Sequence, residues 1–112
     1  MAFSNTKLSD IVVVSAGATT DIITVSSSKK VYIRSIMVHA GTAVTTTAQV
    51  YVVPNGGSVA DSTRLFNVDV VTNDTVLIEP SFPIVLDTNG DKLSVGAGAS
   101  TVNVFITGDK EA

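Results

Sequence analysis

The stretch from Phe82 to Gly108, FPIVLDTNGDKLSVGAGASTVNVFITG, contains three short runs in which apolar and polar residues alternate. The apolar positions of the three runs are Phe82, Ile84 and Leu86, then Leu93 and Val95, then Val102, Val104 and Ile106. Alternation with a period of two places successive side chains on opposite faces of a sheet. The stretch therefore predicts three half-buried strands, and it contains no reactive group that would indicate a chemistry.

Similar runs precede this stretch, and turn-forming residues such as Pro54-Asn55-Gly56-Gly57 separate them. They predict further strands at Leu8 to Val14, Asp21 to Ser26, Val31 to Ala40, Ala48 to Val53, Arg64 to Val70 and Thr75 to Glu79. About eight or nine short strands at this spacing predict an all-β fold, a two-sheet antiparallel β-sandwich. Jelly-roll and immunoglobulin-like topologies both fit, because alternation does not give the strand order.

The phase of the alternation changes within the longest run, Val31 to Ala40. Val31 and Ile33 share one face, whereas Ile36, Val38 and Ala40 share the other. Either both faces of this strand are covered, or a β-bulge near Arg34-Ser35 resets the register, and we favour the bulge.

Composition and charge exclude several classes of function. The chain has 112 residues, of which 45% are hydrophobic and 15% charged, with a net charge of −3 and no cysteine. Without a basic patch it is not expected to bind nucleic acid, and without thiols it has neither disulfides nor thiolate metal sites. No stretch approaches the ~20 apolar residues that span a bilayer, so we expect no membrane partner.

The chain is predicted to form one domain with two short extensions. Residues 1–7 are polar and irregular and are interpreted as a flexible arm, residues 8–108 as a single β-sandwich domain, and residues 109–112 as a charged tail. The first residues do not resemble a signal peptide, because the apolar run after Asp10 is too short. We therefore expect a complete protein made in the cytoplasm.

The residues that could carry chemistry do not form a motif. His39 is the single histidine, and it lacks the oriented partners that a catalytic or metal site needs. The acidic residues near predicted turns are Asp74, Asp87, Asp91 and Asp109. A calcium site between loops is one reading of them, but aspartate is also a common turn former, which we favour. No catalytic residue, cofactor or metal is therefore expected.

A few apolar residues are predicted to lie on the strand faces opposite the core: Tyr51, Val53, Val85 and Phe105. Together with Phe3 of the arm they are candidates for a partner interface, because contiguous exposed apolar area usually has a purpose. The alternative is that both faces of these strands are buried within the domain.

From Lys30 to Gly108 the chain resembles the small structural proteins of tailed bacteriophage virions. The resemblance rests on KVYIRSIMVHAG, on AQVYVVPNGG and on the stretch from Phe82 to Gly108. It implies a β-sandwich that decorates, or cements, the capsid, with the major capsid protein or other virion proteins as partners. It also implies a homo-oligomer, a dimer or a trimer, on the capsid surface after synthesis in the cytoplasm of a bacterial host.

The resemblance offers no catalytic motif, so an enzyme is not expected. Two other functions remain open. One is another position in the virion, such as a neck, tail or fibre module. The other is a carbohydrate-binding β-sandwich, which the low aromatic content of 5% disfavours.

Overall fold

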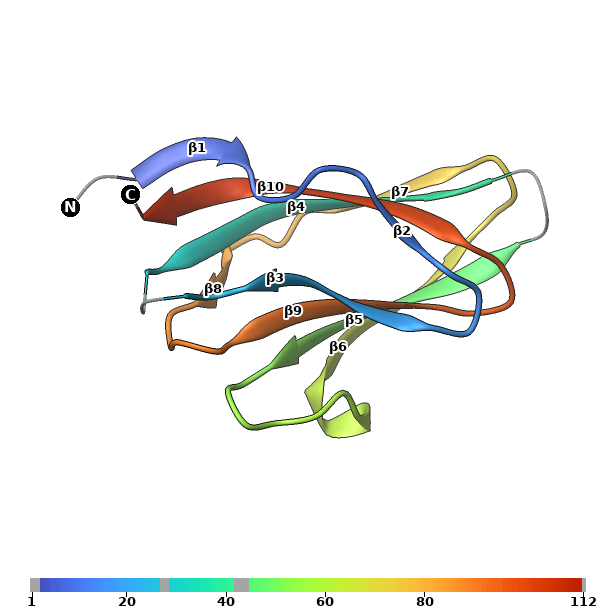
Figure 1. Cartoon of the computed structure of the whole chain (residues 1–112). Coiled ribbons are helices and arrows are strands. Elements are labelled where there is room, and N and C mark those ends of the chain that lie inside the picture. The colour runs from blue at the N-terminus through green and yellow to red at the C-terminus, as the bar shows by residue number, and fades with distance from the viewer. Residues whose placement is uncertain (1–2, 27–28, 42–44, 112) are drawn as a thin grey trace.

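The computed structural model describes residues 3–26, 29–41 and 45–111 as two antiparallel sheets that face each other (Figure 1). The predicted all-β sandwich is therefore confirmed. The described part of the chain contains ten strands. Two of them are short and lie end to end with another strand along the edge of a sheet.

The first sheet has six strands, with β10 and β4 at its centre. β1 and β2 both pair with one side of β10, and β7 and β8 both pair with the far side of β4. Its strands are β1 (Phe3–Lys7), β2 (Val12–Val14), β4 (Val31–Ala40), β7 (Thr75–Ile78), β8 (Ile84–Leu86) and β10 (Val102–Glu111).

The second sheet has four strands in the order β3-β9-β5-β6. A single turn of 3-10 helix, η1 (Asp61–Thr63), lies in the connection from β5 to β6. The strands are β3 (Thr19–Thr24), β5 (Thr46–Val53), β6 (Arg64–Val70) and β9 (Lys92–Ala97).

The strand order identifies a jelly roll. β2 pairs with β10, β3 with β9, β4 with β7 and β5 with β6, so the first half of the chain pairs with the second half in reverse order. Such pairing describes one long antiparallel ribbon folded over into two sheets, which is the double Greek-key arrangement of jelly rolls. The immunoglobulin-like alternative is excluded because its sheets join different strands.

The core lies between the two sheets and is made almost entirely of β-branched residues and leucine. From the stretch that opens the sequence analysis, Leu86, Leu93, Val95, Val102, Val104 and Ile106 are all buried, as predicted. β4, the neighbour of β10 in the same sheet, supplies Val31, Ile33, Ile36, Val38 and Ala40 to the core. Each sheet thus buries one face, which explains why the chain alternates apolar and polar residues.

The predicted β-bulge in β4 is present. Ser35 pairs with Thr107 and Ile33 pairs with Gly108, so Arg34 is the extra residue between two consecutive pairs. A Cβ at Gly108 would collide with the Tyr32 carbonyl, so the partner strand needs glycine opposite this bulge. The extra residue changes the phase of β4 and lets both of its halves turn their apolar side chains inward.

The ends of the domain differ from the sequence prediction. Within the predicted arm, residues 3–7 form β1, and within the predicted tail, residues 109–111 belong to β10; residues 1–2 and 112 lie outside the described residues. β1 is a polar edge strand whose backbone pairs with β10, so it carries no apolar alternation to reveal it. Phe82, expected on the buried face, is 85% exposed and precedes Pro83, outside β8.

Candidate interaction surface

Four of the titratable residues singled out in the sequence, His39, Asp74, Asp91 and Asp109, make hydrogen bonds within strands and turns. In the described ranges no group of three or more His, Asp or Glu side chains is arranged to hold a metal ion. His39 Nδ1 and Thr75 Oγ1 share a hydrogen bond of 2.9 Å across β4 and β7. Asp74 Oδ1 accepts a hydrogen bond from the Thr75 backbone N–H at 2.9 Å, and the Asp109 carboxylate accepts one from Arg34 Nε at 2.6 Å.

Asp91 joins two neighbouring turns. Its carboxylate accepts the Asn55 N–H at 3.1 Å and the Thr88 N–H at 3.0 Å. The Pro54–Gly57 and Thr88–Asp91 turns are each closed by a backbone hydrogen bond, and their third residues, Gly56 and Gly90, have φ of +81° and +94°. A positive φ at that position is typical of a type II turn. The turn interpretation of Asn89-Gly90-Asp91 is confirmed.

The outer face of the four-stranded sheet is a polar network. The Ser94 hydroxyl donates to Asp21 Oδ1 at 2.6 Å, and Lys92 Nζ lies 3.4 Å from Asp21 Oδ2. The Ser94 hydrogen bond lowers the pKa of Asp21 from its ordinary value; burial opposes this shift, and the neighbouring Lys92 adds to it more weakly. Asp21, Ser94 and Lys92 of this face therefore satisfy one another.

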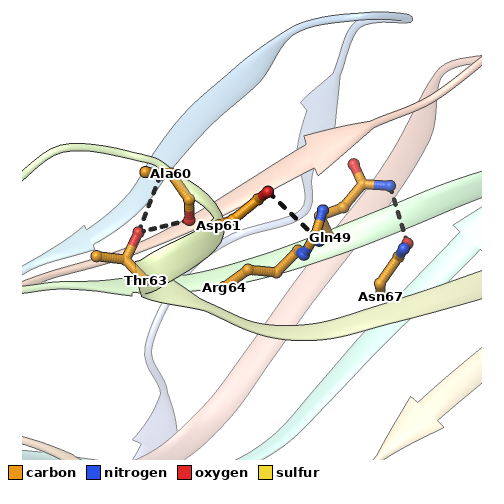
Figure 2. Close-up of polar contacts among 6 residues, drawn as sticks. All are labelled: Gln49, Ala60, Asp61, Thr63, Arg64 and Asn67. Atoms are coloured by element: carbon orange, nitrogen blue, oxygen red, sulfur yellow. Dashed lines mark hydrogen bonds and ion pairs between the residues drawn. The ribbon is translucent and has the colours of Figure 1, made fainter.

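Further polar contacts lie on β5, on β6 and in their connection, as Figure 2 shows. Gln49 Nε2 donates to Asn67 Oδ1 at 3.1 Å, and Arg64 forms an ion pair of 3.4 Å with Asp61 of η1. The Thr63 hydroxyl lies within hydrogen-bond distance of the backbone N–H and C=O of Ala60, which fixes the 3-10 turn beside β6. This side of the sandwich is suited to contact with solvent.

The outer face of the six-stranded sheet is apolar at its centre. Phe105 of β10 pairs with Met37 of β4, and Met37 pairs with Leu77 of β7, so three apolar side chains form a line across three adjacent strands. Ile11 lies beside Phe105 and Met37 in a shallow hollow. We call these four residues, Ile11, Phe105, Met37 and Leu77, the apolar row. Ile11 is 67% exposed and Leu77 52% exposed.

Neutral polar residues border the apolar row on both sides. Asn103, His39 and Thr75 form the next line of cross-strand neighbours on one side. On the other side Ser35 and Thr107 share a hydrogen bond of 2.6 Å between their hydroxyls. Two of the pairs that flank the row, His39 with Thr75 and Ser35 with Thr107, are therefore already hydrogen-bonded within the sheet.

Two hollows lie along the apolar row, and Met37 lines both. One of about 210 Å³ is bounded by Ile11, His39, Asn103 and Phe105, and the other, of about 400 Å³, by Arg34, Leu77, Glu79 and Thr107. Both hollows are open and shallow. They could receive side chains of a facing protein surface, but they do not enclose a small molecule.

The predicted interface residues do not form one patch. Val85 of β8 and Phe105 of β10 lie on the outer face of the six-stranded sheet, whereas Tyr51 and Val53 lie on β5 of the other sheet. Val53 is only 2% exposed, so its assignment to an exposed face is wrong. It has the same parity as Tyr51 but lies beside the β5–β6 connection, whose η1 turn contacts β5. Phe3 lies in β1, and its side chain is outside the described part of the structure.

Sequence reasoning missed Ile11, Met37 and Leu77. Each was placed in or next to a predicted strand, but the alternation does not say which strands become neighbours. The apolar row exists only because β10, β4 and β7 pair in a fixed register. Met37 and Leu77 occupy strand positions that the alternation assigns to the outward, polar face. A search for large apolar residues at such positions would have found both.

All four sheet edges in the described structure are interrupted. One edge of the six-stranded sheet is split between β1 and β2, and the other is split between β7 and β8 by Pro80 and Pro83. In the four-stranded sheet, Ile22 of β3 and Leu65 of β6 are the extra residues at register shifts. Interrupted edges disfavour pairing with a strand from another molecule.

Comparison with known proteins shows a likeness of fold. No protein family model matches the chain, and no curated protein matches it. Among solved structures, one of the infectious bursal disease virus Gx strain is 12% identical with a TM-score of 0.50, covering 97% of this chain. The chain spans 31% of that viral protein.

Two further structures have lower TM-scores. One of Bacillus endospore appendages, described as disulfide-linked pili, is 17% identical with a TM-score of 0.49 and covers 97% of this chain and 90% of its own. One of T=1 particles derived from infectious bursal virus is 13% identical with a TM-score of 0.49 and covers 98% of this chain and 31% of its own. At 12% identity, the likeness to the Gx-strain virus structure concerns the fold alone.

Proposed function

We propose that this chain is a non-enzymatic structural protein of a virion, a capsid decoration protein that stabilises the head shell by bridging major capsid subunits. The observation that carries the proposal is the apolar row on the outer face of the six-stranded sheet. Exposed, contiguous apolar area of this kind is typical of a surface used in assembly.

The distribution of polarity over the molecule supports a role in assembly. One outer face is a satisfied polar network, the other presents the apolar row, and the strand edges are interrupted. A protein built in this way associates through its apolar face, while its polar face and its strand edges remain in contact with water. The jelly roll is also a common architecture of viral capsid proteins, and the residues of the chain resemble those of tailed-phage virion proteins.

The mechanism is the addition of buried interface to an assembled shell. A protein that binds only the assembled shell stabilises it by mass action, in proportion to its occupancy and affinity. Full burial of one large apolar side chain is worth about 1.5–3 kcal/mol, so an interface that covers the apolar row supplies a useful part of this affinity.

The proposal is tested by adding the purified chain to heads assembled without it. We expect saturable binding, density for the chain on the head shell in cryo-EM maps, and heads that open at a higher temperature when they are decorated. Density only at the neck, tail or fibres would replace decoration by another virion role, and no binding to any part of the particle would reject the proposal.

A variant links the binding to the apolar row. Phe105→Asp places a carboxylate in the row, and we expect it to lower head occupancy by at least about tenfold at equal concentration. The control is Leu65→Asp, which changes an exposed leucine on the other sheet and is expected to bind as the wild type does. Equal occupancy by Phe105→Asp and the wild type would exclude the row from the mechanism.

A further inference from the structure

We propose that Asn55 is a site of spontaneous deamidation, which converts its side-chain amide to a carboxylate, and that the fold protects Asn89 from the same reaction. The chain contains two Asn-Gly dipeptides, Asn55-Gly56 and Asn89-Gly90, so each serves as a reference for the other. The reaction is independent of the proposed role in a virion, because it needs no partner protein.

The two dipeptides occupy equivalent positions in two turns of the same kind. Asparagine is the second residue and glycine the third in the turns at residues 54–57 and 88–91. Backbone hydrogen bonds of 2.8 and 2.9 Å close the two turns, and their glycines have φ of +81° and +94°. Both asparagines are exposed. Local sequence, turn geometry and exposure therefore do not distinguish the two sites.

Deamidation begins at the backbone nitrogen of the glycine. This nitrogen loses its proton to a base from the solvent and attacks Cγ of the preceding asparagine, which glycine permits because it has no side chain. The Cγ–Nδ2 bond breaks, ammonia leaves with a proton from the solvent, and a succinimide ring joins Cγ to the nitrogen. Water then opens the ring at either carbonyl and yields aspartate or isoaspartate. The net change is the exchange of one ammonia for one water, without any oxidant or reductant.

Hydrogen bonding at the attacking nitrogen distinguishes the two sites. Gly90 N–H donates to the Val25 carbonyl at 2.9 Å, and Val25 N–H donates to the Asp91 carbonyl at 2.8 Å. These two bonds continue the pairing of β3 with β9 into the turn. The proton that must leave is therefore held in a ladder, and the reaction at Asn89 requires local opening of the sheet.

Gly56 N–H lacks this protection. Among the residues that the structure describes, none accepts a hydrogen bond from it. The turn is held instead by the bond from Gly57 N–H to the Pro54 carbonyl and by the bond from Asn55 N–H to Asp91, and neither engages the attacking nitrogen. Gly56 is exposed, so a base from the solvent can reach its N–H.

The product places a new charge where the two turns meet. Asn55 N–H donates to Asp91 Oδ1 at 3.1 Å, and the Asn55 side chain occupies the space that a Cβ at Gly90 would need. A carboxylate at this position lies close to the carboxylate of Asp91. Isoaspartate has the same charge and also lengthens the main chain of the turn by one carbon. Either product makes the net charge of −3 more negative.

Incubation of the folded full chain at mildly alkaline pH, followed by mass spectrometry of its peptides, tests the proposal. Trypsin cuts after Arg34, Arg64 and Lys92, which puts Asn55 and Asn89 into different peptides. We expect the mass gain of deamidation to appear at Asn55 at least about tenfold faster than at Asn89.

The chain unfolded in guanidinium chloride is the matched control, because it contains both dipeptides without the hydrogen bonds of the fold. The two sites are expected to react at comparable rates there. The variant Asn55→Gln is expected to lose the fast mass gain, since ring closure from glutamine is slower, and to keep the slow gain at Asn89.

Amide hydrogen exchange of the folded chain measures the cause directly. Relative to the unfolded chain, we expect the Gly90 N–H to be slowed at least about tenfold more than the Gly56 N–H. Equal exchange protection of the two glycines would overturn the proposal. So would equal reaction rates in the folded chain, a faster reaction at Asn89, an unmodified Asn55, or a rate difference that persists in the unfolded chain.

Discussion

Gly90 has a φ of +94°, a backbone conformation that residues with a Cβ rarely adopt. A Cβ at this position would also collide with the Asn55 side chain of the adjacent turn. The same two turns are joined by the Asp91 carboxylate, which accepts the Asn55 N–H at 3.1 Å. The connection between β8 and β9 is thus fixed by a residue whose importance lies in its lack of a side chain.

We therefore expect Gly90→Ala to lower the free energy of unfolding by about 1–3 kcal/mol, measured by urea denaturation. The control is Gly41→Ala, because a Cβ at Gly41 meets no atom within 4 Å and its φ is not in the left-handed region. If both variants are as stable as the wild type, the packing of the two turns contributes nothing to stability.

Single residues also show the limit of sequence-based prediction. The Asn89-Gly90 turn was predictable because its chemistry is local. Val53 was placed on an exposed face because its parity in β5 points away from the core, yet it is buried. Parity gives the side of a sheet on which a side chain lies, and it does not say whether a connection such as that from β5 to β6 covers this side.

At the scale of the element, one extra residue determines which side chains of β4 point into the core. Val31 and Ile33 point into the core on one side of Arg34, and Ile36 and Val38 do so on the other. The bulge was predictable because the apolar–polar alternation changes phase within the sequence of this strand. β1 was not predictable, because a polar edge strand is held by backbone pairing with β10 and has no apolar face.

Deletion of Arg34 would remove the extra residue and turn one half of β4 away from the core. We expect a loss of about 4 kcal/mol or more, or failure to fold, in thermal and urea unfolding. Arg34→Ala keeps the bulge and loses only the ion pair with Asp109, and it is expected to cost less than about 1 kcal/mol. A deletion variant no less stable than Arg34→Ala would contradict this account of β4.

At the scale of the whole molecule, the strand order was the part that the sequence could not supply. Alternation describes each strand by itself, and the pairing of Val14 with Val102 follows from the way in which the ribbon folds over. The apolar row depends on the same strand pairing. This surface therefore could not be predicted from the sequence before the topology was known.

This pairing has a consequence for folding. Because the early strands pair with the late ones, much of the chain must be ordered before the central contacts form. We expect single-domain folding with a rate constant on the order of 1 to 100 per second in stopped-flow refolding. Interrupted unfolding separates this phase from slow proline isomerisation. Refolding within microseconds would show that the pairing of early strands with late strands does not limit the folding rate.

The pairing of β1 with β10 places Phe3 opposite Glu111, so the two described ends of the chain lie side by side at one corner of the sandwich (Figure 1). A short linker between these ends and a new opening in a distant turn would give a circularly permuted chain with the same sheets. A peptide fused at either end would be displayed at that corner. The molecule thus offers one site for attaching cargo and leaves both of its broad faces uncovered.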